Sequence, residues 1–176
     1  MAEEKKEGWL NLLGLTTVIL AVCATLATFK GGGYSTRTVL NQAMASDQWA
    51  YYQAKDIKGN LYEVEAMRLR RDLELAPKAA MPVLEKGLAD VEKKVAKYTG
   101  EKAEIQKKAT AFEEAKADAQ RHGAPFGLAV IYLQIGILLS SIAALLKQKP
   151  VYWAGLVVGL LGLVYFANGF LLFFPV

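Results

Sequence analysis

Residues 125–146 read PFGLAVIYLQIGILLSSIAALL and contain no charged side chain. Two further stretches share this property, WLNLLGLTTVILAVCATLATF at 9–29 and VYWAGLVVGLLGLVYFANGFLLFFPV at 151–176. The hydrocarbon core of a bilayer is about 30 Å thick, and a helix needs about 20 apolar residues to cross it. A signal peptide could explain one such stretch but not three. We therefore predict an all-α membrane protein with transmembrane helices at 9–29, 125–147 and 151–176.

All of the charged residues lie outside these stretches. Residues 30–124 carry most of them, with Lys and Arg interleaved with Asp and Glu, and a short tail at 1–8 carries others. The net charge is +4. Nucleic-acid-binding proteins usually gather basic residues on one face, whereas mixed signs are typical of a solvated helix surface with weak ion pairs. We expect the lipid bilayer to be a partner and expect no nucleic acid.

Residues 34–76 predict a long helix, because helix-forming residues dominate and no proline interrupts them. Its apolar residues recur with the spacing of a coiled-coil seam, although Asp47 falls among them. These residues are Ala43, Ala50, Ile57 and Val64 at intervals of seven, with Leu40, Ala54 and Leu61 at the companion position. We expect this seam to face the next helix of the chain.

Residues 83–121 predict a second helix with a more regular heptad pattern, interrupted by Lys102 and Lys116. Its seam consists of Leu84, Val91, Tyr98, Ile105, Phe112 and Ala119, with Leu88, Val95 and Ala109 beside them. Pro77 and Pro82 predict a turn at 77–82. We therefore predict that residues 30–124 form an antiparallel coiled-coil hairpin between the first two transmembrane helices.

Glycine and proline predict where this hairpin meets the membrane. Gly31, Gly32 and Gly33 follow the first apolar stretch, and Gly123 and Pro125 precede the second. Both residue types interrupt helices, so we expect a break in the helix at each place.

Few residues of this chain suggest chemistry. It has one cysteine, Cys23, in an apolar stretch and one histidine, His122, near an expected helix end. One of each cannot supply a metal cluster or a Cys–His pair within one chain. The carboxylates are spread along helix surfaces, and no glycine-rich phosphate loop follows a strand. We predict no catalytic, cofactor-binding or metal-binding residues, and hence a protein that is not an enzyme.

One part of the first long helix is unusually rich in aromatic and hydrogen-bonding residues. The candidates there are Asp47, Gln48, Trp49, Tyr51 and Tyr52. If the turn is centred near residue 80, they lie beside the returning helix, in a layer with three residues of its seam. Those three are Tyr98, Ile105 and Phe112. The layer is either internal aromatic packing or a recognition surface for another subunit.

Within the apolar stretches, Gln134 and the pair Gly155 and Gly159 are the candidates for interaction. A glutamine in mid-membrane seeks a hydrogen bond with another helix, or less simply lines a pore. Glycines four residues apart allow helices to approach closely, either within one chain or between chains.

The loop of Lys147 and Lys149 and the tail with Lys5 and Lys6 should share one side of the membrane. Basic residues in short segments favour the cytoplasm, which places the hairpin on the extracytoplasmic side. Glu3, Glu4 and Glu7 in the tail weaken this interpretation, as do basic residues just after the first stretch.

The run SDQWAYYQAK at residues 46–55, with one span before it and two after it, resembles bacterial membrane proteins of domain of unknown function family 4337. The resemblance extends from Trp9 to the end of the chain. It implies a bacterial inner-membrane protein with a basic loop between the last two spans, which agrees with Lys147 and Lys149. It implies no activity, substrate or catalytic residue.

These observations favour a non-enzymatic membrane scaffold or accessory subunit. We expect it to associate through its hairpin and its small-residue transmembrane faces, as a homo-oligomer or as part of a larger complex. A channel-like oligomer, with the second or third span lining a pore, is the alternative. A third interpretation is a sensor of envelope stress.

Overall fold

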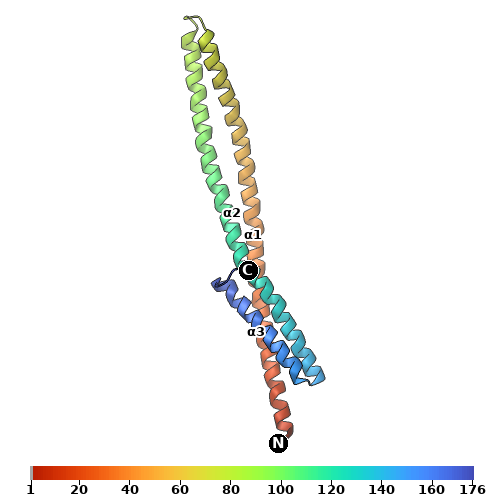
Figure 1. Ribbon diagram of the computed structural model, residues 1–176. Helices are drawn as coiled ribbons and strands as arrows, with labels where there is room; N and C mark the ends of the chain where they lie inside the picture. The colour runs from red at the N-terminus through yellow and green to blue at the C-terminus, as the bar shows by residue number, and fades with distance from the viewer. Residues whose placement is uncertain (1) are drawn as a thin grey trace. The chain divides into compact units, whose positions relative to one another are not determined.

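The computed structural model describes residues 2–176, with side chains from Gly8 onward. It contains three helices in the order α1 (Ala2–Leu75), α2 (Met81–Leu146) and α3 (Lys149–Leu171) (Figure 1). Contacts divide the chain into two compact units. We call residues 2–39 and 116–176 the transmembrane unit, and residues 40–115 the charged unit.

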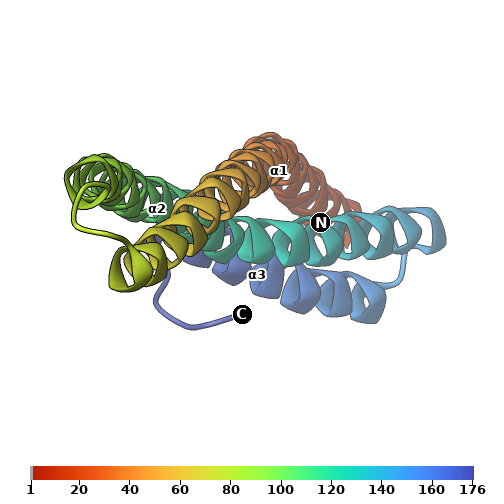
Figure 2. The same ribbon diagram turned by 90° about the horizontal axis from the view of Figure 1, so that it is seen from above.

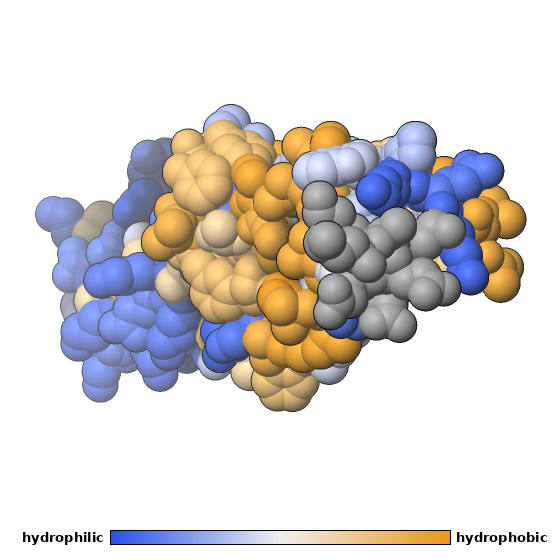
Figure 3. Space-filling view, turned by 90° about the horizontal axis from the view of Figure 1, so that it is seen from below, coloured by the Kyte–Doolittle hydropathy of each residue, from blue (hydrophilic) through white to orange (hydrophobic). Residues whose placement is uncertain are grey.

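Each of the three helices contains a segment long and apolar enough to cross a membrane. Figure 3 shows that hydrophobic side chains cover much of the face seen from below. Val18, Val22, Ile131 and Leu138 are each more than half exposed. Such a surface is stable in lipid and costly in water. This confirms the prediction of an all-helical chain with three apolar helices, as in a multi-pass membrane protein.

The core of the transmembrane unit is centred on Phe126 of α2, which is fully buried. The rings of Tyr34, Phe166 and Phe170 lie 5.9, 5.9 and 4.9 Å from its ring. Residues from all three helices thus surround one aromatic side chain. A buried ring of this size contributes more than any aliphatic neighbour to the packing of the unit.

Small residues let α2 and α3 approach until their backbones touch. A Cβ atom on Gly136 would lie only 2.9 Å from the Cα of Gly159, and one on Gly155 only 3.1 Å from the carbonyl oxygen of Gly136. Gly162 and Ser140 are buried in the same unit. Figures 1 and 2 both show α3 beside the final part of α2. The small-residue faces are therefore used within one chain, which decides between the two alternatives for Gly155 and Gly159.

The expected helix breaks beside the membrane are wrong, because α1 and α2 continue through both places. The glycines there serve close packing instead of a turn. A Cβ on Gly31 would lie 3.2 Å from the Cβ of Phe126, and one on Gly123 would lie 3.3 Å from the Cβ of Tyr34. Pro125 is buried inside α2 and lacks the N–H that a helix uses. Packing around Phe126 compensates for that loss.

The third apolar stretch is helical only to Leu171, so the prediction of a span to residue 176 is too long. Leu172 has a left-handed conformation with φ of 49°, which ends the helix. The side-chain amide of Asn168 then donates to the carbonyl of Phe174 at 3.0 Å and accepts from its N–H at 3.1 Å. Because Asn168 is fully buried, these two bonds hold the residues after the helix against its last turn.

In the charged unit, α1 and α2 lie side by side and run in opposite directions (Figure 1). Contacts between them link residues near the turn, such as Arg70 with Glu92 at 2.6 Å, and residues far from it, such as Trp49 with Glu113 at 2.9 Å. The connection spans residues 76–80, where the N–H of Ala80 donates to the carbonyl of Pro77 at 2.9 Å. Both helix ends fall within two residues of the expected turn.

The α2 residues of the predicted seam are buried or half-buried, from Leu84 to Phe112. The prediction that the α1 seam faces α2 is wrong, because Ala43, Ala50, Ile57 and Val64 are all exposed. The residues that α1 buries are offset from them by two positions. They are Ala45, Gly59 and Ala66, with Tyr52 half-buried among them. Small residues on this face of α1 let the side chains of α2 approach closely. A Cβ added at Gly59, for example, would lie 3.6 Å from the Cβ of Tyr98.

We expect Gly136→Ala to destabilise the transmembrane unit by about 1–3 kcal/mol, because its methyl group would collide with backbone atoms that cannot rotate away. Gly127→Ala is the matched control: it lies on the same helix and a Cβ there meets nothing within 4 Å. Thermal unfolding of both variants in detergent measures the difference. Equal melting temperatures would contradict the backbone contact.

Candidate functional site

Two of the candidate residues of α1, Trp49 and Tyr52, form one aromatic pair, whereas the candidate Tyr98 of α2 belongs to a separate pair with Tyr62. Trp49 donates from its indole nitrogen to Oε1 of Glu113 at 2.9 Å, and Tyr52 meets its ring edge to face at 5.6 Å. Trp49 and Tyr52 are half-buried. This pair therefore anchors α1 to the returning helix, at the position along α2 that the sequence predicts.

The second aromatic pair is Tyr62 with Tyr98, whose rings stack at 5.6 Å with 14° between their planes. The ammonium group of Lys94 lies 4.9 Å from the ring of Tyr62, and that of Lys55 lies 5.4 Å from the ring of Tyr98. The prediction that Tyr98 packs with Trp49 to Tyr52 is wrong. Tyr98 instead stacks on Tyr62 and lies beside Gly59.

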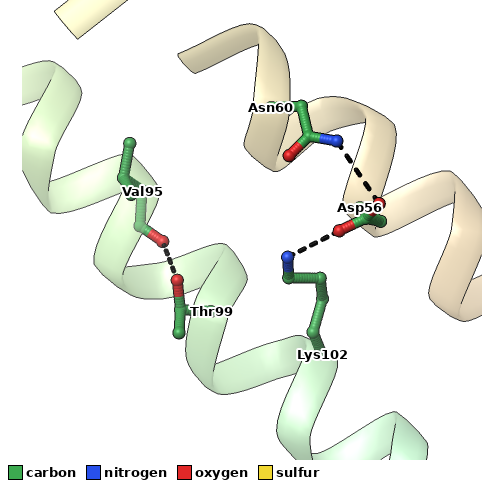
Figure 4. A network of polar contacts seen from close by, with 5 residues as sticks. All are labelled: Asp56, Asn60, Val95, Thr99 and Lys102. Atoms are coloured by element: carbon green, nitrogen blue, oxygen red, sulfur yellow. Dashed lines mark hydrogen bonds and ion pairs between the residues drawn. The ribbon is translucent and has the colours of Figure 1, made fainter. Parts of the chain in front are cut away.

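Between the two aromatic pairs lie two ion pairs of opposite polarity. Lys55 of α1 meets Glu101 at 2.7 Å, and the next residue, Asp56, meets Lys102 at 2.6 Å. Asn60 donates a further hydrogen bond to Asp56 at 3.3 Å, as Figure 4 shows. Sliding one helix along the other would separate both pairs. The arrangement thus favours one register of α1 against α2.

Sequence reasoning missed these ion pairs and treated Lys102 as an interruption of the seam. A signal was present, because Lys55-Asp56 and Glu101-Lys102 are adjacent residues of opposite charge on two helices expected to run antiparallel. The heptad pattern of α1 hides this signal, because it places the inner face on Ala50, Ile57 and Val64, which are exposed.

The ion pairs change the pKa values of all four groups. Hydrogen bonds from Lys102 and from Lys55 lower the pKa of Asp56 and of Glu101 below their ordinary values of 3.8 and 4.5. The same two bonds raise the pKa of Lys102 and of Lys55 above 10.5. All four groups therefore stay charged at neutral pH, and they act as structural contacts with no shift toward values useful for proton transfer.

The other candidates of the charged unit have different surroundings. Ile105 is buried, whereas Gln48 and Phe112 are half-buried. Tyr51 is half exposed, and the ammonium group of Lys55 lies 5.2 Å from the centre of its ring. Asp47 is exposed. The predicted aromatic surface thus divides into residues that join the two helices and residues that face outward.

In the transmembrane unit, Gln134 lies on the outer surface of α2 and is exposed. The expected hydrogen bond to another helix is not formed within the transmembrane unit as described. His122 stacks on Tyr34 at 5.1 Å, and its Nδ1 lies 3.1 Å from the carbonyl oxygen of Asp118. Among the residues described, no three His, Cys, Asp or Glu side chains are grouped so that they could hold a metal ion.

The comparison with known families decides the membership of the chain. The family described as Domain of unknown function (DUF4337) matches residues 9–172, which include the apolar segments of all three helices and the whole charged unit. The chain is a DUF4337 protein. This confirms the resemblance carried by residues 46–55. No curated protein and no solved structure matches this DUF4337 chain. Its function must therefore be argued from its own surfaces.

We expect acid to weaken the charged unit of the DUF4337 protein through its ion pairs. Because the pKa of Asp56 and Glu101 is lowered on folding, their contribution is present above the ordinary values of 3.8 and 4.5 and is lost as the pH falls through the folded values. Circular dichroism melting between about pH 7 and about pH 3 tests this. Glu101→Gln should lower stability at neutral pH and reduce its acid dependence. The exposed control Glu104→Gln should do neither, and identical acid profiles for all three proteins would contradict the role of the pairs.

Proposed function

We propose that this DUF4337 protein is a non-enzymatic membrane scaffold or accessory subunit that associates with other chains through its charged unit. One observation carries the proposal. The outward face of α1 in this unit bears large apolar side chains in water-facing surroundings, and Ile57, Leu61 and Val64 are each more than 60% exposed. A contiguous apolar face of this kind on an otherwise charged helix is typical of a surface that another protein covers.

We further propose that the charged unit is an antiparallel coiled-coil hairpin that projects from the bilayer. Support comes from the regular spacing of the α2 seam and from the contacts that join the helices at both ends of the unit. The ion pairs of Lys55 and Asp56 favour a single register, so the unit can present its outward residues at constant spacing. Such a constant spacing of outward residues suits a scaffold.

The small-residue transmembrane faces are not proposed as contacts with other chains. Gly136, Gly155, Gly159 and Gly162 are buried between helices of the same chain and are not available to a neighbour. The contacts with other chains must use residues that remain outward, such as Ile57, Leu61 and Val64 of the charged unit.

A channel-like homo-oligomer is the second candidate, and Gln134 is the observation that favours it. Its amide faces outward from the middle of an apolar segment, where lipid offers no hydrogen bond. Several copies of α2 could satisfy their Gln134 amides with each other or with water in a pore. The spans contain no ionisable side chain, which ion pathways usually have. That difference makes the scaffold the preferred function.

The proposed location is the inner membrane of a bacterium, with the hairpin on the extracytoplasmic side. Lys147, between α2 and α3, and Lys149, the first residue of α3, are exposed, and basic residues in short connections favour the cytoplasm. Lys5 and Lys6, the other basic residues used for this assignment, lie outside the residues whose side chains are described.

We expect the detergent-purified protein to contain more than one chain and its lipid vesicles to remain impermeable to small ions. Light scattering with mass measurement gives the number of chains, and ion flux across vesicles tests for a pore. Flux that Gln134→Leu abolishes would support the channel and overturn the scaffold. A monomer that copurifies with no other subunit would contradict both functions.

Sidedness has its own test. Lys78 lies in the exposed turn of the charged unit, so a cysteine there, in a Cys23→Ser background, reports the side of the membrane. We expect an impermeant thiol reagent to label Lys78→Cys in intact spheroplasts. Lys147→Cys, in the opposite loop, should react only after the membrane is permeabilised. The reverse pattern would place the hairpin in the cytoplasm.

A further inference from the structure

Helix α1 of the charged unit has two apolar faces on opposite sides. The inner face includes Tyr52, Gly59 and Ala66 at intervals of seven residues and meets α2. The outer face includes Ala50, Ile57 and Val64, also at intervals of seven. The two series are offset by two residues, which is about 200° around a helix with 3.6 residues per turn. Helix α1 thus carries a second apolar face that α2 does not cover.

We define the outer stripe as the exposed residues Leu40, Ala43, Ala50, Ile57, Leu61 and Val64. Together with Asp47 and Ala54, these residues follow one another in alternating steps of three and four, which match the core positions of a coiled coil over about three and a half heptads. The large members are well exposed: Leu40 by 54%, Ile57 by 62%, Leu61 by 65% and Val64 by 64%. A second helix running along α1 is the neighbour that this spacing fits, because only a helix repeats its contacts with that period.

We propose that a second copy of this chain covers the outer stripe, with the two α1 helices parallel and in register. The proposal rests on the proposed function and names the partner of the charged unit. Two copies in one membrane have the same orientation, so their α1 helices run in the same direction. A twofold axis between them then places each residue of the stripe against its own equivalent.

The residues that flank the stripe fit this arrangement. The stripe occupies heptad positions a and d, and positions g and e flank it. In a parallel coiled coil, each residue at position g faces the residue at position e that lies five residues later on the partner. These pairs are Ser46 with Tyr51, Gln53 with Lys58, and Asn60 with Glu65. Each pair contains at least one uncharged residue, so no like charges face each other across the parallel arrangement.

Asp47 is the one charged residue within the heptad core of the stripe. It is exposed in the single chain, and the parallel register would bring it close to the Asp47 of the second copy. Two carboxylates in one core layer repel each other and weaken association. Removing this charge should therefore strengthen the pair, a result that a solvent-facing Asp47 would not produce.

Disulfide cross-linking in lipid vesicles tests the register. In a Cys23→Ser background, Ala43→Cys and Val64→Cys should each form a covalent dimer on oxidation, because equivalent residues in the core of a parallel pair lie within disulfide reach. An antiparallel pair can bring at most one position opposite itself, so it cannot cross-link at both. Ala103→Cys, exposed on α2, is the control and should remain monomeric. Equal cross-linking of the control would overturn the proposal.

Substitutions test the energetics in the same vesicles. Ile57→Lys should lower the association constant of the dimer by about a hundredfold, since each dimer loses two buried isoleucines. Asp47→Leu should raise it by at least about tenfold. Val83→Lys makes the same apolar-to-basic change at a residue that is 75% exposed on α2, and it should have no effect.

The outcomes separate this inference from the proposed function. If the wild type contains several chains but Ala43→Cys and Val64→Cys do not cross-link, the second copy does not cover the stripe and the scaffold proposal survives. If the wild type is monomeric and no other subunit copurifies, both fail. If Ile57→Lys releases a different subunit while the protein itself stays monomeric, the partner is another protein and the inference of a second copy is wrong.

Discussion

The backbone contact between α2 and α3 is the constraint on which the transmembrane unit depends. In lipid, apolar side chains gain little by leaving the solvent, so helices associate through close packing. Gly136 and Gly159 provide it by letting two backbones approach to a distance that no side chain permits. The fully buried Phe126 then fills the space among the three helices, and Gly31 and Gly169 leave room for its side chain. Glycines that suggest turns in a soluble protein act here as contact surfaces.

The helices of the charged unit pack differently, since few apolar residues lie between them. Small residues on the inner face of α1 allow Tyr62 and Tyr98 to stack, and the ion pairs of Lys55 and Asp56 favour one register. These contacts are specific more than strongly stabilising, because partly exposed ion pairs contribute little net free energy. The apolar side chains that would add stability lie on the opposite face of α1. That division is why we infer that the unit is completed by another chain.

The proposed function rests on surfaces that remain outward after the chain has folded. The small-residue faces and the Trp49 and Tyr98 contacts are used internally. The outer stripe of α1 and the amide of Gln134 are not. Both features are typical of contacts with another chain, and neither suggests a reaction. The proposed membrane scaffold, which pairs through α1, accounts for the outer stripe.

The sequence by itself determined the helical class, the three apolar segments, the turn near Pro77 and the α2 seam. It could do so because hydrophobic length and heptad spacing act locally along the chain. Only the tertiary structure decided which face of α1 meets α2, since two apolar series two residues apart are equally regular in sequence. The choice depends on contacts between residues of different helices, namely the stacking of Tyr62 on Tyr98 and the ion pairs of Lys55 with Glu101 and of Asp56 with Lys102. Likewise, the role of Gly31 and Gly123 depends on Phe126 and Tyr34, whose approach no local pattern records.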